Sequence, residues 1–444
     1  MKKNCRQCGV NYKVDEKFFQ KVALPTPTLC PDCRQIRRML FRNDRVFYNR
    51  KCDLSGKQFI STYAPDLPYK VYHPDEWYGD KWDAMSYGCD FDFNRSFFEQ
   101  FSNLINVVPR LGIDIVNCEN SYYCNFCGDD KDCYLDIAGE ANRDCYYNLF
   151  VKHSKDVCDC TFVYNSELCY ESINCYQCYA VQHSMYCDNC SDLYFCFDLI
   201  GCRNCLFSSG LRNKEYYIFN EKKTKEEYEK YLEKLKLGSF SQREKLKLGW
   251  QKFKRENAIF RAGQFLNCEN VSGDNLKNCK NTFESFNASN CEDCAYLYDV
   301  LDAKNCQDLN YSLYKPELSC ELISTLSMIK SAFSMSSHYN NEVFYCDMVN
   351  NSTNLFGCIA LNHKQYCILN KQYTKEQYEA LLPKIIEHMQ KTGEWGEFLP
   401  TSISPFAYNE TVANEYYPLS KDEALKRGLK WREDHRGNVY KGPA

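Results

Sequence analysis

The chain has 444 residues, of which 44% are hydrophobic and 15% are aromatic. This length and composition exclude a disordered chain and indicate two to four globular domains. The net charge of −4 is small, so overall charge predicts neither nucleic-acid nor membrane binding, and any basic site must be local.

Thirty cysteines are the most unusual feature of the composition. In a secreted protein this density would indicate a disulfide framework. The first residues, MKKNCRQCGV, contain no apolar segment of a signal peptide, and no stretch approaches the roughly 18 apolar residues of a membrane span. We therefore expect a cytoplasmic protein without membrane association, although export by a route that needs no such signal stays open.

Residues 1–50 begin with two Cys-x-x-Cys pairs, Cys5/Cys8 and Cys30/Cys33. Zinc prefers four tetrahedral ligands, and soft thiolates hold it in a closed, unreactive site. The two-residue gap lets one tight turn direct both sulfurs of a pair to the same ion. The pattern predicts one structural Zn²⁺ bound by these four cysteines. The alternative, a redox pair, needs no second Cys-x-x-Cys.

The same segment resembles a widespread type of short zinc-ribbon domain. The shared pattern is CxxCG, an acidic and aromatic stretch at residues 15–19, and CPxCR followed by arginines. The resemblance covers about residues 4–40 and implies zinc binding only, because such ribbons occur in proteins of many functions.

An arginine-rich stretch follows the second pair. A helix over residues 34–45 would place most of these arginines on one face. The interpretation we favour is a solvated helix that pairs with the acidic residues between 75 and 92. The alternative is a nucleic-acid site in which guanidinium groups bind phosphates. The candidate residues are Arg34, Arg37, Arg38, Arg42 and Arg45.

Residues 51–116 form an aromatic connecting segment. Within it, residues 96–105 carry apolar side chains at helical spacing, and Pro109 ends the pattern. This stripe is more typical of a packed core than of a cofactor site.

An internal repeat follows. Residues 117–228 match residues 267–378 with a constant offset of 150 and no gap; for example, Asn117-Cys118-Glu119-Asn120 returns as Asn267-Cys268-Glu269-Asn270. Within each copy, short strand-like runs and polar turns recur about every 12 residues, and tyrosines recur with them. The pattern predicts a mainly β protein with two tandem β-solenoid units at 117–237 and 266–392. A right-handed β-helix is the expected form, with a coil of either about 12 or about 24 residues.

Many repeat cysteines also have Cys-x-x-Cys spacing. The set Cys175, Cys178, Cys187 and Cys190 could form a second four-thiolate metal site. The second copy has Thr325, Met328, Ser337 and Asn340 at these positions, and a metal needed for folding would be difficult to lose in this way. We favour buried, reduced thiols that fill the interior of the repeat. Extra zinc and disulfides are the remaining alternatives.

Each repeat unit is expected to end in a helix. Thr224 and Thr374 are predicted N-caps, followed by acidic residues in the first turn. Such helices would cover the exposed strand edges at the end of a solenoid. Residues 238–265 read as a charged helical linker, and residues 393–444 as an irregular segment with a short helix at 421–427.

Over nearly its whole length the chain resembles a family of uncharacterised, Cys-rich proteins of uncultivated bacteria. The shared elements are the N-terminal ribbon, the Cys/Tyr repeats, the strand-to-helix closures at Tyr216–Tyr228 and Tyr366–Tyr378, and the segment Pro405–Thr411. The resemblance implies the domain plan and no specific activity.

We therefore predict a non-catalytic, zinc-binding interaction or scaffold protein that presents a rigid repeat surface to a protein partner. An RNA- or DNA-associated protein that uses the arginine helix is the alternative. An enzyme is least favoured, because the sequence has no phosphate loop, dinucleotide fingerprint, HExxH or nucleophile elbow. Composition does not indicate an oligomeric state.

Overall fold

The computed structural model describes residues 1–433, so the last eleven residues of the predicted irregular segment 393–444 lie outside it. The chain is mainly β, as predicted, and its largest sheets are parallel. Its described residues form two compact units: residues 1–112 combine with residues 262–433, and residues 113–261 form the other unit. Among the described residues, no helix has both the length and the apolar character needed to cross a membrane.

The N-terminal segment is a hairpin followed by two helices. Strands β1 (Lys2–Asn4) and β2 (Asn11–Lys13) pair antiparallel. Helix α1 (Glu16–Lys21) follows, with Asp15 accepting a hydrogen bond from the Phe18 backbone N–H. Helix α2 (Pro31–Met39) is capped by Cys30 and begins with a proline, a residue that fits the first turn because it has no N–H to leave unpaired. The helix expected over residues 34–45 thus begins earlier, at Pro31, and ends earlier, at Met39.

The connecting segment contains short strands and one longer helix. Strands β3 (Tyr48–Lys51) and β4 (Gln58–Ser61) pair antiparallel, and β5 (Val71–Tyr72) pairs in parallel with β6 (Arg110–Leu111). The short helices are α3 (Pro74–Trp77) and η1 (Ala84–Tyr87). The predicted helical stripe is confirmed as α4 (Phe97–Val107), which Ser96 caps and which buries Phe97 and Phe101 completely.

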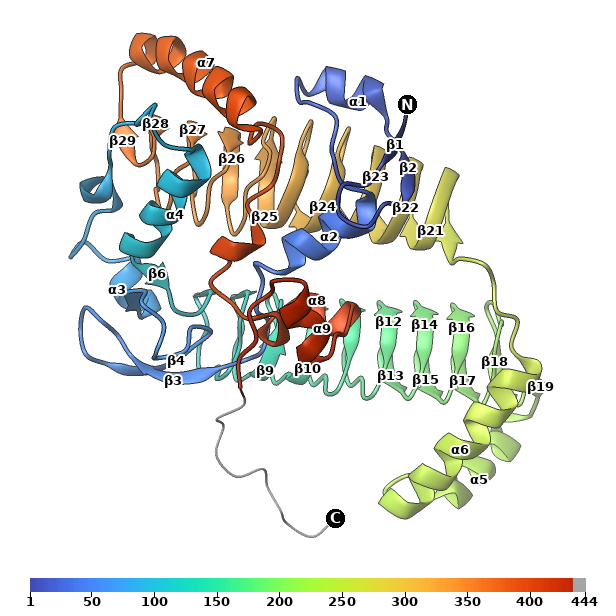
Figure 1. Ribbon diagram of the computed structural model, residues 1–444. Helices are drawn as coiled ribbons and strands as arrows, with labels where there is room; N and C mark the ends of the chain where they lie inside the picture. The colour runs from blue at the N-terminus through green and yellow to red at the C-terminus, as the bar shows by residue number, and fades with distance from the viewer. Residues whose placement is uncertain (434–444) are drawn as a thin grey trace. The chain divides into compact units, whose positions relative to one another are not determined.

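Residues 115–218, here called the first array, form parallel strands (Figure 1). Each strand pairs with residues 12 positions away, as in Tyr122↔Tyr134 and Leu193↔Cys205. The pairing therefore advances by the shorter of the two expected coil lengths. The strands are β7 (Ile115–Val116), β8 (Cys127–Gly128), β9 (Tyr134–Ile137), β10 (Tyr146–Lys152), β11 (Thr161–Tyr164), β12 (Ile173–Tyr176), β13 (Tyr179–Gln182), β14 (Met185–Asp188), β15 (Ser191–Tyr194), β16 (Phe197–Ile200), β17 (Arg203–Leu206) and β18 (Glu215–Ile218), followed by the antiparallel β19 (Glu221–Lys222).

A three-residue period lies within the longer period of the strand pairing. Tyr122 bridges to the next strand, Tyr123 adopts the left-handed region with φ of 56°, and Cys124 is buried. The same order of bridging, left-handed and buried residue continues along the array. Asn and Asp are common at the left-handed position, which they tolerate better than other non-glycine residues. The buried positions are spaced by three and include Cys145, Val151, Val157, Cys160, Val163, Cys169, Cys175, Cys178, Val181 and Cys187.

Buried Ser and Cys side chains make equivalent hydrogen bonds to the backbone inside the first array. The Ser184 hydroxyl donates to the Gln182 carbonyl at 2.8 Å and accepts from the Cys196 backbone N–H at 3.0 Å. The Cys190 thiol donates to the Asp188 carbonyl at 3.3 Å and accepts from the Cys202 backbone N–H at 3.4 Å. A small side chain that both donates and accepts therefore satisfies backbone groups that the parallel pairing leaves free.

Residues 265–368, here called the second array, belong to one ten-stranded sheet in chain order (Figure 1). Its strands are β20 (Phe265–Leu266), β21 (Glu269–Lys277), β22 (Lys280–Ser289), β23 (Glu292–Leu301), β24 (Gln307–Leu313), β25 (Cys320–Ile329), β26 (His338–Phe344), β27 (Thr353–Phe356) and β28 (Gln365–Ile368). The antiparallel β29 (Lys371–Gln372) completes the sheet.

The register of the second array shifts twice. Val271 pairs with Thr282, one residue short of the usual advance, and a bulge follows before Gly273. Gln307 pairs with Cys320, one residue beyond it. The two shifts cancel over the whole repeat. Between them, however, a residue of the second array occupies the structural position of the first-array residue 149 positions earlier, not 150 as in the sequence match. In that stretch, the buried Cys279, rather than Lys280, corresponds to position 130 of the first array.

Helices follow both arrays, as predicted. Helix α5 (Lys225–Leu235) begins at a Thr224 capping box, and α7 (Lys375–Thr392) at a Thr374 capping box. Helix α5 packs on β18 and α7 on β28. The charged linker contains α6 (Phe240–Asn257). The C-terminal segment contains η2 (Thr401–Ile403), η3 (Tyr408–Glu410), α8 (Val412–Tyr416) and α9 (Lys421–Lys426).

Candidate metal centre

The first cysteine pair lies in a tight turn between β1 and β2. The Gly9 backbone N–H donates to the Cys5 carbonyl at 2.9 Å, and the Cys5 N–H donates to the Val10 carbonyl at 2.9 Å. Gly9 has a φ of 74°, a left-handed conformation that glycine adopts without strain. This turn brings Cys5 and Cys8 to the same side of the hairpin end.

The second pair lies at the start of α2. Cys30 is the N-cap, and Cys33 is in the first turn. The Arg34 backbone N–H donates to the Cys30 carbonyl at 3.0 Å, which closes that turn. The helix start therefore holds both sulfurs in fixed positions.

The two pairs converge. The sulfurs of Cys5, Cys8, Cys30 and Cys33 all lie within 4.8 Å of one another, and the sulfurs of Cys8 and Cys30 are 3.6 Å apart. Cys5, Cys30 and Cys33 are buried, whereas Cys8 is exposed. Four converging thiols form a closed donor set that suits a tetrahedral, soft or borderline metal ion.

The surroundings of these thiols differ in their effect on ionisation. At Cys5, burial raises the pKa, but hydrogen bonds from backbone groups of Cys30, Cys8 and Gln7 outweigh it and lower the pKa to about 6. Burial raises the pKa of Cys30 and of Cys33. A bound cation would stabilise all four thiolates together and remove this conflict.

The arginines after the second pair are mostly buried, which corrects the expected solvated helix. The Arg34 guanidinium is 2.8 Å from an Asp308 carboxylate oxygen and donates to the Leu29 carbonyl at 2.6 Å. Arg37 pairs with Glu321 at 3.1 Å and with Glu397 at 2.8 Å. These acidic partners lie in the second array and after α7, not between residues 75 and 92.

Arg38 and Arg42 complete this contact. Arg38 donates to the Asn310 side chain at 2.8 Å, and Arg42 donates to the Ser324 hydroxyl at 2.6 Å. Both are buried, and only Arg45, which pairs with Glu415, is exposed. Four of the five candidate phosphate-binding arginines therefore serve to pack α2 and the residues after it on β24 and β25.

The second predicted set of thiols, Cys175, Cys178, Cys187 and Cys190, occupies successive buried positions of the first array. Cys175 and Cys187 are direct partners in neighbouring strands. Within residues 1–433 these four sulfurs do not form a group in which all lie within 4.8 Å of one another. Their Cys-x-x-Cys spacing follows from the three-residue period of the buried positions.

A different set of side chains does converge in the first array: Asp130, Cys133 and Asp136, all buried, place ligand atoms within 4.8 Å of one another. This group is not among the sites predicted from the sequence. Its signal is the spacing of three between successive members, which is the spacing of buried positions throughout the array.

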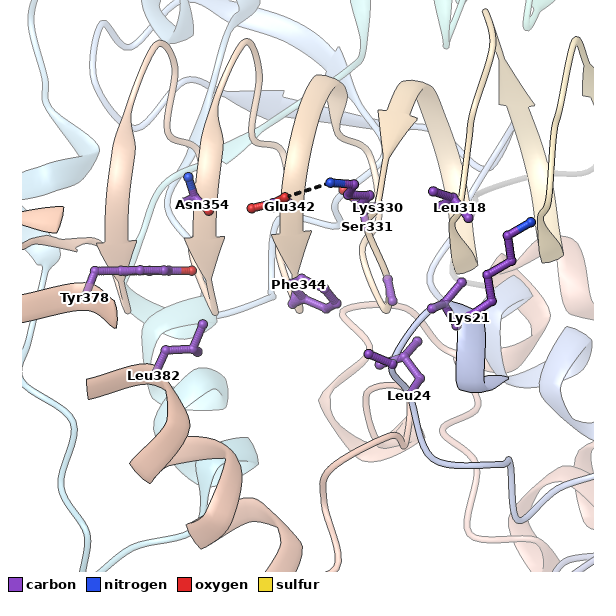
Figure 2. A pocket seen from close by; sticks show the side chains of 13 residues that line it. Lys21, Leu24, Leu318, Lys330, Ser331, Glu342, Phe344, Asn354, Tyr378 and Leu382 are labelled. Atoms are coloured by element: carbon purple, nitrogen blue, oxygen red, sulfur yellow. Dashed lines mark hydrogen bonds and ion pairs between the residues drawn. The ribbon is translucent and has the colours of Figure 1, made fainter. Parts of the chain in front are cut away.

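A cavity of about 300 Å³ lies in the unit that contains the second array. Figure 2 shows Leu24 on one side of it, Tyr378 of α7 on another, and the ion pair of Lys330 with Glu342 (3.3 Å) on the strands. Phe344 also lines it. The lining combines this ion pair and the polar side chains of Lys21, Ser331 and Asn354 with aromatic and aliphatic side chains, and among the described residues it contains no cysteine or histidine.

Comparison with known proteins assigns no family. No protein-family model matches the chain, and no curated protein matches it. Among solved structures, a protein from Desulfovibrio desulfuricans G20 that is assigned as an acetyltransferase is 11% identical, with a TM-score of 0.12 over 56% of this chain and 65% of that chain. The polySia-specific acetyltransferase NeuO is 9% identical, with a TM-score of 0.07 over 61% of this chain and 94% of that chain. Likenesses at these scores carry no argument about fold or activity.

Proposed function

We propose that Cys5, Cys8, Cys30 and Cys33 bind one structural Zn²⁺, and that the resulting zinc ribbon holds the N-terminal segment on the second array. The observation that carries this proposal is the continuity of α2. Its first turn supplies Cys33, and the next residue, Arg34, is buried against Asp308. A metal at the start of the helix would therefore fix the residues that make the contact with the array. Four protein thiolates leave no open position for a substrate, which favours a structural role over a catalytic one.

We further propose that both arrays are β-solenoids in a non-catalytic interaction protein. Support comes from the four bridging positions in each period of the first array, illustrated by Glu119↔Lys131, Tyr122↔Tyr134, Asn125↔Ile137 and Gly128↔Glu140. Such a pattern fits a coil with four short sides. The right-handed winding of this coil stays a prediction. The 30 free thiols, all within the described residues, fit a reducing compartment such as the cytoplasm.

The surface of the first array supports a protein partner. Tyr122, Tyr146 and Tyr147 are 64%, 39% and 56% exposed, and the Tyr134 ring contacts the Tyr147 ring edge to face at 5.6 Å. Tyrosine supplies a large contact area with few rotatable bonds and is enriched at protein interfaces. We infer that this tyrosine face, defined by Tyr122, Tyr134, Tyr146 and Tyr147, is where a partner binds.

Metal analysis tests the first proposal. Purified full-length protein should lose about one zinc equivalent per chain in a C5S/C8S variant. The matched control is C89S, which removes an exposed thiol outside the cluster and should leave the zinc content unchanged. Equal zinc in C5S/C8S and in the wild type would overturn the assignment.

A photo-crosslinking residue at position 146 tests the second proposal. In extracts of the source organism, we expect one discrete protein adduct that disappears when Tyr122 and Tyr147 are changed to Ser. The same crosslinker at exposed Leu248 of α6 is the control. An adduct that disappears after nuclease treatment would favour the RNA- or DNA-associated alternative, and an adduct insensitive to the tyrosine changes would refute the tyrosine face.

A further inference from the structure

The interior of the first array contains two carboxylates for which residues 1–433 provide no counterion. Asp130 and Asp136 are 1% and 0% exposed. One oxygen of each, Oδ2 of Asp130 and Oδ1 of Asp136, has no hydrogen-bond partner in the described part of the chain. A buried carboxylate without a partner is costly, so such a pair needs a reason to be present.

The structural role of position 130 does not need an acid. Oδ1 of Asp130 accepts a hydrogen bond from the Asn142 backbone N–H at 2.9 Å. In the next strand Asn142 accepts in the same way from Ser154 N–H at 3.1 Å, and then Ser154 accepts from Ser166 N–H at 3.2 Å. Neutral side chains therefore do this work in the strands that follow. The backbone hydrogen bond therefore needs neither the second oxygen of Asp130 nor its negative charge.

Gly139 lies directly against both carboxylates. A methyl group placed on Gly139 would lie 2.7 Å from Asp130 Oδ2 and 2.5 Å from Asp136 Oδ2. Gly139 does not have a left-handed φ, so its backbone does not require glycine; a side chain there would instead collide with the two carboxylates. Asn142 orients one of them by donating to Asp136 Oδ2 at 2.8 Å.

The thiol of Cys133 completes the group. It is 1% exposed, and its sulfur lies within 4.8 Å of an oxygen from each aspartate. We propose that Asp130, Cys133 and Asp136 bind a second metal ion inside the first array. Two carboxylates and one thiolate match the ligand preferences of Zn²⁺ and similar divalent transition ions, rather than those of Ca²⁺ or Mg²⁺, which prefer all-oxygen sites.

The second array provides an internal comparison. With its register shift, the buried positions that correspond to the three ligands are Cys279, Thr282 and Ser285, and Ala288 replaces Gly139. None of these residues is acidic, so the corresponding positions of the second array do not provide the same ligands. The proposed site is also distinct from the N-terminal cysteine cluster.

The experiment compares metal content in four forms of the full-length chain after reconstitution with Zn²⁺. The wild type should bind two equivalents, D130N/D136N one, and C5S/C8S one. The control D129N changes a neighbouring exposed acid and should bind two. Asparagine preserves the acceptor for the backbone N–H, so D130N/D136N should unfold at the same or a higher denaturant concentration than the metal-free wild type.

Cobalt gives a second readout. With Co²⁺ in place of zinc, the C5S/C8S variant should keep a thiolate-to-metal absorption band, and adding C133S to it should remove this band. Excess Ca²⁺ should leave the band of C5S/C8S unchanged. Equal metal content in D130N/D136N and the wild type would overturn the proposal. If C5S/C8S loses one equivalent and D130N/D136N loses none, the N-terminal site is supported and the aspartates are a buried pair without a metal.

Discussion

Cysteine pairs with a two-residue gap occur in both the N-terminal segment and the first array, but they lie in different surroundings. Cys5 and Cys8 flank a hairpin turn, and the start of α2 brings a second pair within 4.8 Å. Cys175 and Cys178 are successive buried positions of a three-residue period. The difference shows that this spacing fixes only the local separation of two sulfurs. A four-thiolate site also needs two pairs brought together by the fold.

Of the expected differences between the two regions, the largest is the response to removal of the proposed zinc. Structural zinc contributes on the order of 10–16 kcal/mol to folding in small zinc modules. We expect chelation to raise hydrogen exchange sharply in residues 1–45, while the buried strands β15 and β17 keep their protection. Unchanged exchange in the N-terminal segment would contradict the structural role of the metal.

The next largest expected effect is the slow alkylation of the buried array cysteines compared with an ordinary cysteine. Cys196 is fully buried in the first array, and burial raises its pKa to about 12. At pH 8 such a thiol has about 10³-fold less thiolate than an ordinary cysteine with a pKa near 8.5. Alkylation followed by peptide mass spectrometry should leave Cys196 unmodified in the folded protein and modify it in denaturant. Rapid labelling of folded protein at Cys196 would show that the array interior opens readily.

The contact between α2 and the second array should be the next most sensitive feature. Arg34→Ala leaves Asp308, which is fully buried, without its nearest cation. Breaking a buried pair in this way costs about 3–5 kcal/mol, measurable by denaturant unfolding of the zinc-loaded protein.

The control for this change is Arg45→Ala, because Arg45 pairs with Glu415 at the surface. Exposed pairs contribute roughly 0–1 kcal/mol. Similar losses in Arg34→Ala and Arg45→Ala would mean that the buried contact does not hold the helix. Replacing Asp308 by Asn together with Arg34→Met should recover part of the lost stability, because both charges of the pair are then removed and Arg38, which also contacts Asp308, keeps Glu321 at 3.5 Å.

The smallest expected effect is that of Cys190→Ser. Serine already fills equivalent buried positions, and Ser184 makes the same two backbone hydrogen bonds as Cys190. We expect the free energy of unfolding to change by less than about 1 kcal/mol. The matched change Cys33→Ser should instead remove the N-terminal metal. A large loss in Cys190→Ser would indicate that the array thiols also bind metal.

Part of the array could be predicted from the sequence and part was missed. The longer period is visible because tyrosines and cysteines recur with it, and the pairing Tyr122↔Tyr134 confirms that spacing. The three-residue period has a signal as well: an Asn or Asp directly before a buried Cys, as in Asp144-Cys145, Asn189-Cys190 and Asn290-Cys291. Recognising this dipeptide as a left-handed residue followed by a buried one would have located Asp130, Cys133 and Asp136.

The sequence by itself determined the local features: the four N-terminal cysteines in two tight turns, the Thr224 and Thr374 helix caps, and a mainly β body with a regular strand advance. Each depends on residues close together in the chain, where spacing controls geometry directly. Only the tertiary structure decided that Arg34 and Arg37 are buried against Asp308 and Glu321. Those partners lie 274 and 284 residues away along the chain, and no local pattern encodes which charged groups two distant segments bury together.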